Sequence, residues 1–200
     1  MTVLLQTPDE RLLEATGFGG NIDLVAQALR DGANPNARQP GTWDGTVISS
    51  LWGVAGHTAL RQAIECTARL ADANPADRTV VVRLLLDAGA DPNLHCNEET
   101  LLTTAARYGD GSLVALLLER GAGKSVLERD IHKGRTALET AIEAQQWHVG
   151  GGNVDLIDDA EQAVALLREA TRQAIAEQQA VLHAAAGEVS VEHRSTRRRL

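Results

Sequence analysis

The stretch "VVRLLLDAGADPN" (residues 81–93) decides the fold, because the chain contains close copies of it. The copies are "LVAQALRDGANPN" (24–36), "LVALLLERGAGKS" (113–125) and a reduced form, "AVALLREAT" (163–171). Shorter alanine-rich segments precede them: "RLLEAT" (11–16), "TALRQAI" (58–64), "TLLTTAA" (100–106) and "TALETAI" (136–142). Internal similarity of this kind indicates a repeat protein in which each unit is one supersecondary element.

Each unit is predicted to be a short alanine-rich helix, a leucine-rich helix and a turn. The glycine that follows the first three leucine-rich segments is typical of a helix C-cap, where a left-handed conformation carries no Cβ penalty. The Ala-Asn/Asp-Pro-Asn run after it holds residues that stabilise turns through their own backbone. Thr58, Thr100 and Thr136 are placed to cap the next helix. No single unit could bury its apolar face alone, so the units are expected to stack.

The phased segments "TALRQA" (58–63), "TLLTTA" (100–105) and "TALETA" (136–141), with the "GANPN" and "GADPN" turns, resemble ankyrin repeats. The Pro and His of the family's T-P-L-H-x-A pattern are both replaced here. The resemblance covers about residues 10–170. It implies an all-α solenoid of four helical-hairpin repeats whose turns form β-hairpin or turn fingers. After residue 170 the pattern indicates either that the outer helix runs on or that a C-terminal capping helix closes the stack.

On this basis the whole chain, 1–200, is predicted to be one array. Its parts are repeat one (10–38), a long finger (39–56), repeat two (57–95) with an insertion (65–77), repeat three (96–128), repeat four (129–171) with an insertion (143–159), and a C-terminal helix with a basic tail (172–200). The two insertions are expected to lengthen the connections between paired helices. They lie two repeats apart, so they are expected to meet across the short third repeat.

The long finger holds two of the three tryptophans, Trp43 and Trp52. Two interpretations stay open for this pair. The rings form a small internal core of a hairpin, or they are presented to a partner, since tryptophan is a preferred hot-spot residue.

Composition and charge exclude several classes of protein. The net charge is −8, and the last eight residues, "HRSTRRRL", carry four arginines, so residues 1–192 sum to −12. An acidic body argues against a general nucleic-acid binder. No apolar run reaches the length of a membrane span, and no export signal or disulfide framework is evident, so we expect a cytoplasmic protein. The basic tail has three interpretations: a solvated end, a strap against the acidic body, or a short anion-binding arm.

Motifs for catalysis or metal binding are weak. "GAGKS" (121–125) resembles the end of a phosphate-binding loop, but the full pattern requires glycine where Leu118 stands. His57, His95, Cys96 and His132 show none of the paired spacings of zinc sites. The acids Asp155, Asp158, Asp159 and Glu161 are explained by a helix N-terminus. We therefore predict no catalytic residue, no cofactor and no metal.

The predicted function is a non-catalytic protein–protein interaction module, acting as an adaptor, an inhibitor or an immunity- or antidote-like protein. The family resemblance implies that the partner meets the concave face and the fingers. The acidic body favours a basic partner. The implied partner-binding residues are Phe18, Trp43, Trp52, His57, Asn97, Glu99, Arg107, Tyr108, His132, Lys133 and Arg135.

Two alternatives to this function remain open at this point. One is an enzyme or a small-ligand or metal-binding protein with a cleft between the finger and the insertions, using His57, His132, Trp147 and His148. A weaker alternative is nucleic-acid association through the arginine-rich tail, although too few aromatics accompany it for base stacking.

Overall fold

A computed structural model provides the structure of the chain, and it describes residues 6–17, 21–40, 56–69, 75–96, 99–131, 133–151 and 154–197. The helical elements of these residues are α1 (Pro8–Gly17), α2 (Ile22–Arg30), α3 (Ala59–Arg69), α4 (Pro75–Asp87), α5 (Leu101–Arg107), α6 (Gly111–Glu119), the 3₁₀ helix η1 (Ala122–Ser125), α7 (Ala137–Gly151) and α8 (Val154–Arg197). The described residues contain no β-strand.

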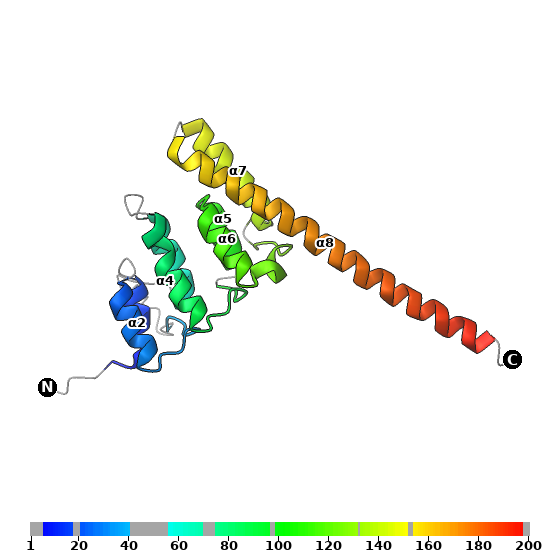
Figure 1. The fold of residues 1–200 in the computed structure, drawn as a ribbon, viewed down its shortest axis with the longest axis horizontal. Helices are drawn as coiled ribbons and strands as arrows, with labels where there is room; N and C mark the ends of the chain where they lie inside the picture. The colour runs from blue at the N-terminus through cyan, green and yellow to red at the C-terminus, as the bar shows by residue number, and fades with distance from the viewer. Residues whose placement is uncertain are drawn as a thin grey trace.

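The α-helices pair in chain order and the pairs stack side by side (Figure 1). One row of the stack consists of α1, α3, α5 and α7, each in contact with the next, and the other consists of α2, α4, α6 and α8. This is the all-α repeat solenoid that the sequence predicts.

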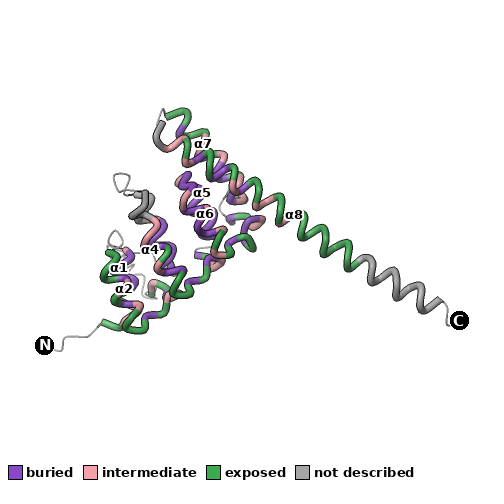
Figure 2. The backbone as a smooth tube through the Cα atoms, in the orientation of Figure 1, coloured by how far each residue is buried: buried purple, intermediate pink, exposed green. Residues whose placement is uncertain are grey.

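One continuous aliphatic core runs through the stack (Figure 2). Leu12, Leu60 and Leu102 occupy equivalent places in the first row and are fully buried. Val82 and Leu117 are fully buried in the second row. Each pair therefore covers the apolar face of its neighbour, which is the physical reason that the repeats occur only as an array.

Side-chain caps define where several helices begin. Asn21, Thr100 and Asp110 accept hydrogen bonds from backbone N–H groups of the first turns of α2, α5 and α6. Thr136 and Glu139 form a reciprocal capping box at α7: Thr136 N–H donates to Glu139 Oε2 at 2.8 Å, and Glu139 N–H donates to Thr136 Oγ1 at 3.3 Å. The bond from the Thr136 N–H and the Arg129 guanidinium hold the pKa of Glu139 below its ordinary value.

Asparagine side chains join the turns of successive repeats. Asn36 donates through Nδ2 to the Gly89 carbonyl at 3.2 Å and accepts from the Asp91 N–H at 2.8 Å. One repeat later, Asn93 donates to the Gly121 carbonyl at 3.0 Å. The first turn has no repeat before it that could supply an asparagine. There the Asp9 carboxylate accepts a hydrogen bond from the Asn34 N–H at 2.7 Å. These bonds form an asparagine ladder that fixes the spacing between repeats.

The ladder depends on the glycines that follow α2, α4 and α6 and end these helices. Gly32, Gly89 and Gly121 have φ values of 90°, 94° and 92°. A side chain is rarely tolerated in this left-handed region, so glycine lets the chain reverse directly after each helix. The "GAGKS" segment begins at the third of these glycines and continues as η1 after a helix, which is the turn expected of a repeat.

Isolated antiparallel bridges close the base of the long finger and the corresponding turn of the next repeat. Arg38 pairs with Thr58 at the base of the long finger, and Cys96 pairs with Glu99 in the next turn. Arg38 also donates to the carbonyls of Gly56 at 2.9 Å and His95 at 3.0 Å, which links the two turns. The rest of the long finger, 41–55, lies outside the described residues, and with it Trp43 and Trp52.

The two insertions lengthen helices. α5 has 7 residues, whereas α3 has 11 and α7 has 15, so both insertions extend the helix that precedes them. α8 continues unbroken to Arg197, which is the first of the two alternatives for the end of the array. Residues 154–197 contain no proline and one glycine, Gly187, and are rich in strong helix formers.

The substitution Asn36→Ala tests the asparagine ladder. It removes two bonds between repeats one and two, and each such bond contributes about 1 kcal/mol. We expect the free energy of unfolding, measured by urea denaturation, to fall by about 1–2 kcal/mol. Gln27→Ala is the matched control, because within the described part of the chain the Gln27 amide bonds Arg30 and Asp31, both at the end of its own helix. Equal stability of the two variants would show that the ladder does not hold the repeats together.

Candidate functional site

A groove of about 310 Å³ lies where α5, α7 and the turn before α7 meet. Its lining residues come from these three elements: Thr103 and Arg107 from α5, Asp130 and Lys133 from the turn, and Thr140, Glu143, Ala144 and Trp147 from α7. The first row of helices and the turns thus supply every lining residue, as expected for the concave side of the solenoid.

α7 contributes one continuous face to the groove. Thr140, Glu143, Ala144 and Trp147 follow the i, i+3, i+4, i+7 spacing that places side chains on one side of a helix. Trp147 is 72% exposed, although large aromatic side chains are usually buried. Its ring packs edge-on against the buried ring of His148, with ring centroids 5.1 Å apart. An indole held in this way offers a large apolar area with little conformational entropy left to lose.

The turn before α7 is organised around Asp130. Asp130 Oδ1 accepts from the Lys133 N–H at 2.6 Å, and Oδ2 accepts from the Arg135 N–H at 3.3 Å. The Asp130 N–H donates to the Arg135 carbonyl at 2.9 Å, which closes the turn. A buried carboxylate therefore fixes the backbone that carries Lys133 and Arg135 at the rim of the groove.

Three cations lie along the rim, and each has a carboxylate partner. Lys133 Nζ is 3.7 Å from Glu143 Oε2, and Arg135 forms an ion pair with the same carboxylate. Arg107 forms an ion pair with Glu99. All three cations remain partly exposed. Because exposed ion pairs contribute little stability, Lys133 and Arg135 can exchange Glu143 for another charged group, whereas Arg107 is paired with the buried Glu99.

A buried ion network supports the groove from the neighbouring repeat. Arg61 Nη2 is 2.8 Å from Glu99 Oε2, and Arg61 Nε is 2.9 Å from Glu65 Oε1. Arg61 Nη1 also donates to the Cys96 carbonyl at 3.0 Å. His57 Nδ1 lies 3.5 Å from Glu65 Oε2. This network connects α3 to the turn of repeat three, and through Glu99 it holds Arg107 at the groove.

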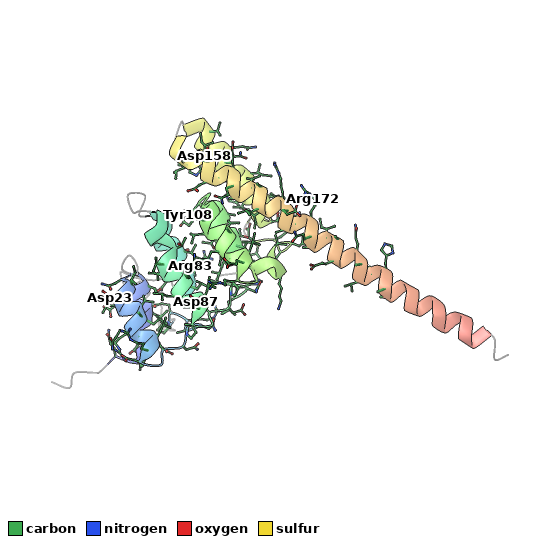
Figure 3. All side chains as sticks on the ribbon, viewed as in Figure 1. Asp23, Arg83, Asp87, Tyr108, Asp158 and Arg172 are labelled. Atoms are coloured by element: carbon green, nitrogen blue, oxygen red, sulfur yellow. The ribbon has the colours of Figure 1, made fainter. Side chains whose placement is uncertain are left out.

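The structure separates the predicted partner-binding residues into three groups. Arg107, Lys133 and Arg135 are exposed or partly exposed at the groove. Tyr108 is half-buried at the end of α5 and lies outside the groove lining (Figure 3). The predicted residues outside the described part of the chain are Phe18, Trp43, Trp52, Asn97 and His132.

His57 and Glu99 form the third group, and the structure places both inside the molecule. His57 is 4% exposed and Glu99 is 3% exposed. Their positions before Thr58 and Thr100 predict that they face a partner, but Glu99 pairs with Arg61 and His57 pairs with Glu65 in the buried network. We therefore reassign them from partner contact to support of the groove.

Comparison with known families agrees with this architecture. Residues 70–149 match the family model described as ankyrin repeats (3 copies). The chain contains ankyrin repeats. A search of the curated proteins finds no match. Ankyrin repeats are generally protein–protein interaction modules, and the family is typically non-catalytic.

Two further findings concern the other functions considered. Within the described ranges, no group of three or more His, Cys, Asp or Glu side chains is arranged to hold a metal ion. His57 and His148 are both buried, in different ankyrin repeats. In the same part of the chain, no helix has both the length and the apolar character that crossing a bilayer requires.

Sequence reasoning did not place Trp147 in the partner-binding set. It lies in the insertion 143–159, which was expected to be a connection, whereas α7 extends through it to Gly151. The signal that would have found it is the spacing from Thr140, since residues 140, 143, 144 and 147 continue one helix face.

The ion network predicts a pH dependence of stability. Burial raises the pKa of Glu65, but the interaction with His57 and the charge of Arg61 outweigh it and lower the pKa from 4.5 to about 2. The unfolded chain therefore binds a proton at this site more readily than the folded chain. The stabilising contribution of Glu65 is complete above about pH 4.5 and is lost as the pH falls toward 2.

We expect the difference in unfolding free energy between the wild type and Glu65→Gln to shrink as the pH is lowered from about 5 to about 2. Urea denaturation at a series of pH values measures this difference. Glu177→Gln, which removes an exposed carboxylate from α8, controls for the general loss of a negative charge. A difference for Glu65→Gln that does not change with pH would contradict the proposed network.

Proposed function

We propose that this ankyrin-repeat protein binds another protein reversibly through the groove between α5 and α7, with Trp147 as the main anchor. The observation that carries the proposal is the 72% exposure of Trp147 beside a groove with partly exposed cations and a carboxylate on its rim. Tryptophan and arginine are enriched among residues that dominate binding energy, and they act best at the centre of an interface.

The groove suggests how a partner is recognised. An apolar side chain of the partner would pack on the Trp147 ring and on the buried Ala144 beside it. Lys133, Arg135 and Arg107 would pair with acceptors on the partner, while Glu143 would pair with a donor. Because the rim carries three cations and the exposed carboxylate of Glu143, the groove favours a segment that carries both signs of charge.

The net charge acts at longer range. Residues 1–192 sum to −12, which favours encounter with a basic partner and faster association at low salt. This long-range attraction is separate from the local, mixed pattern of the groove. An adaptor, an inhibitor and an immunity- or antidote-like protein all remain compatible with binding of this kind in the cytoplasm.

The long finger is a second contact surface in this proposal. It rests on the family resemblance, in which the fingers contact partners. Trp43 and Trp52 would add hot-spot area to one edge of the concave face. The finger leaves the stack at Gln39 and returns at Gly56, one repeat before the groove.

Affinity capture from a lysate of the source organism tests the proposal. The wild type is compared with the groove variant Trp147→Ala/Lys133→Ala, and captured proteins are identified by mass spectrometry. A protein retained by the wild type is expected to be reduced at least about tenfold by the groove variant, since hot-spot truncations cost about 2 kcal/mol or more. Thermal melting checks that the variant remains folded.

Two further variants sharpen the result. Val149→Ala is the matched control, because Val149 is exposed on α7 but does not line the groove. Trp43→Ala/Trp52→Ala removes the finger rings. Loss of the partner with the finger variant alone would move the binding site to the finger. Retention of every captured protein by both double variants would contradict the proposed function.

A further inference from the structure

The groove offers a partner a surface that is more positive than the rest of the chain. Three cations at the groove keep between 37% and 62% of their side chains exposed: Arg107, Lys133 and Arg135. The carboxylate of Glu143 is also exposed, whereas those of Asp130 and Glu99 are buried. The exposed charge of these residues is therefore mainly positive, although residues 1–192 sum to −12. At contact distance this pattern favours an anionic group of the partner.

Two of these cations converge on one oxygen atom. Lys133 Nζ lies 3.7 Å from Glu143 Oε2, and Arg135 forms an ion pair with the same oxygen. The backbone N–H groups of Lys133 and Arg135 both donate to the Asp130 carboxylate, so the turn fixes where the two side chains start. Glu143 belongs to a different element, α7. The turn thus forms a two-cation site for one anionic oxygen, and α7 supplies the oxygen that occupies it.

Glu143 is a replaceable occupant of this site. Its side chain is exposed, and ion pairs in contact with water are weakened by the solvent and contribute little stability. A carboxylate of a partner that makes further contacts in the groove would displace it at a small cost. The released Glu143 would then pair with a basic group of the same partner. This exchange reconciles an acidic anchor with a groove that favours both signs of charge.

Trp147 decides what lies beside the incoming carboxylate. It follows Glu143 by four residues on the same face of α7, so the two Cβ atoms are about 5–6 Å apart. Side chains at positions i and i+2 of an extended segment lie on one side of it and are about 6–7 Å apart. An extended partner segment with an acidic residue and, two residues away, an apolar residue therefore fits the two-cation site and the exposed indole together.

We propose that the groove recognises an acidic side chain of the partner, which replaces Glu143 between Lys133 and Arg135 while an apolar side chain two residues away packs on Trp147. The inference rests on the function proposed above and names the chemistry of the segment that binds. Glu143 acts as an internal competitor for the same two cations. A basic partner remains compatible with an acidic anchor, because the net charge of the chain acts at long range and the anchor acts at contact.

Short peptides added to the full chain at about 0.15 M salt test the inference. The probe is acetyl-Gly-Glu-Ala-Leu-Gly-amide, and two matched peptides carry Gln or Lys in place of Glu. NMR titration follows the indole N–H of Trp147, assigned with Trp147→Phe, and the backbone amides of Lys133 and Arg135. The acidic peptide is expected to shift these signals with a Kd of about 1–10 mM, and the Gln and Lys peptides are expected to bind at least about fivefold more weakly.

Substitutions at the site are expected to change the affinity in opposite directions. Lys133→Gln/Arg135→Gln should weaken binding of the acidic peptide at least about fivefold, because it removes both charged donors. Glu143→Gln should tighten the same binding about two- to fivefold, because the internal competitor loses its charge. A Glu143 side chain with a purely structural role would give no such gain.

Two matched controls remove charges elsewhere. Arg30→Gln/Arg83→Gln removes exposed cations from α2 and α4, and Glu177→Gln removes an exposed carboxylate from α8; none of the three residues lines the groove. Surface charges outside the groove are largely screened at about 0.15 M salt, so both controls should leave the Kd within about twofold of the wild type. An equal gain for Glu177→Gln and Glu143→Gln would show a general charge effect and contradict the role of Glu143 as a competitor.

Preference for the Lys peptide over the acidic peptide would overturn the inference, as would binding to Glu143→Gln that is no tighter than binding to the wild type. The absence of any shift at about 50 mM acidic peptide would overturn it too. None of these results removes a groove-dependent partner from the capture experiment, so the proposed function is judged separately. Retention of every captured protein by both double variants there would contradict that function without bearing on the binding of the peptides.

Discussion

The whole structure depends on one constraint: no helix pair of this chain can bury its apolar face without a neighbour. Leu60 and Leu101 are fully buried because the helices on either side cover them. The glycine-started turns set the distance between pairs, and Asn36 and Asn93 tie each turn to the next. Once this spacing is fixed, the first row of helices forms a continuous concave side. Any residue added to that row therefore changes the surface available to a partner.

The insertions act through this constraint. α5, which has no insertion, ends at Arg107, whereas the insertion of repeat four carries α7 to Gly151. The longer helix extends beyond its neighbour and holds Trp147 above the groove without burying it. The same array that anchors α7 also anchors α8, which packs against α6 and α7.

The sequence predicted the repeats, the turns and the row of inner helices, because those features repeat in phase and use residues with strong local preferences. The "GADPN" turn and the caps at Thr100 and Thr136 are local, and they form where expected. The end of the array remained open between two alternatives, and the structure shows one helix through it. The domain boundaries and the role of Trp43 and Trp52 stay predictions.

The candidate site was harder to predict because its determinants are not local. Glu99 and His57 occupy positions that face partners in the family pattern, but Arg61 and Glu65, both on α3, pair with them in a buried network. Sequence distance alone does not reveal that a guanidinium 38 residues away satisfies Glu99. Trp147 was missed because an insertion was read as a connection. Lys133, Arg135 and Arg107 lie at the surface because the turn and the end of α5 follow the repeat pattern, and their contact with a partner stays a prediction.

The central claim is that a partner contacts the α7 face of the groove, and site-specific photo-cross-linking tests it most directly. A photoreactive phenylalanine analogue is introduced in place of Trp147 or of Val149, and the protein is irradiated in cells of the source organism. The account predicts a covalent adduct with one partner from position 147 and none from position 149. Adducts from position 149 alone, or the same adducts from both positions, would contradict it.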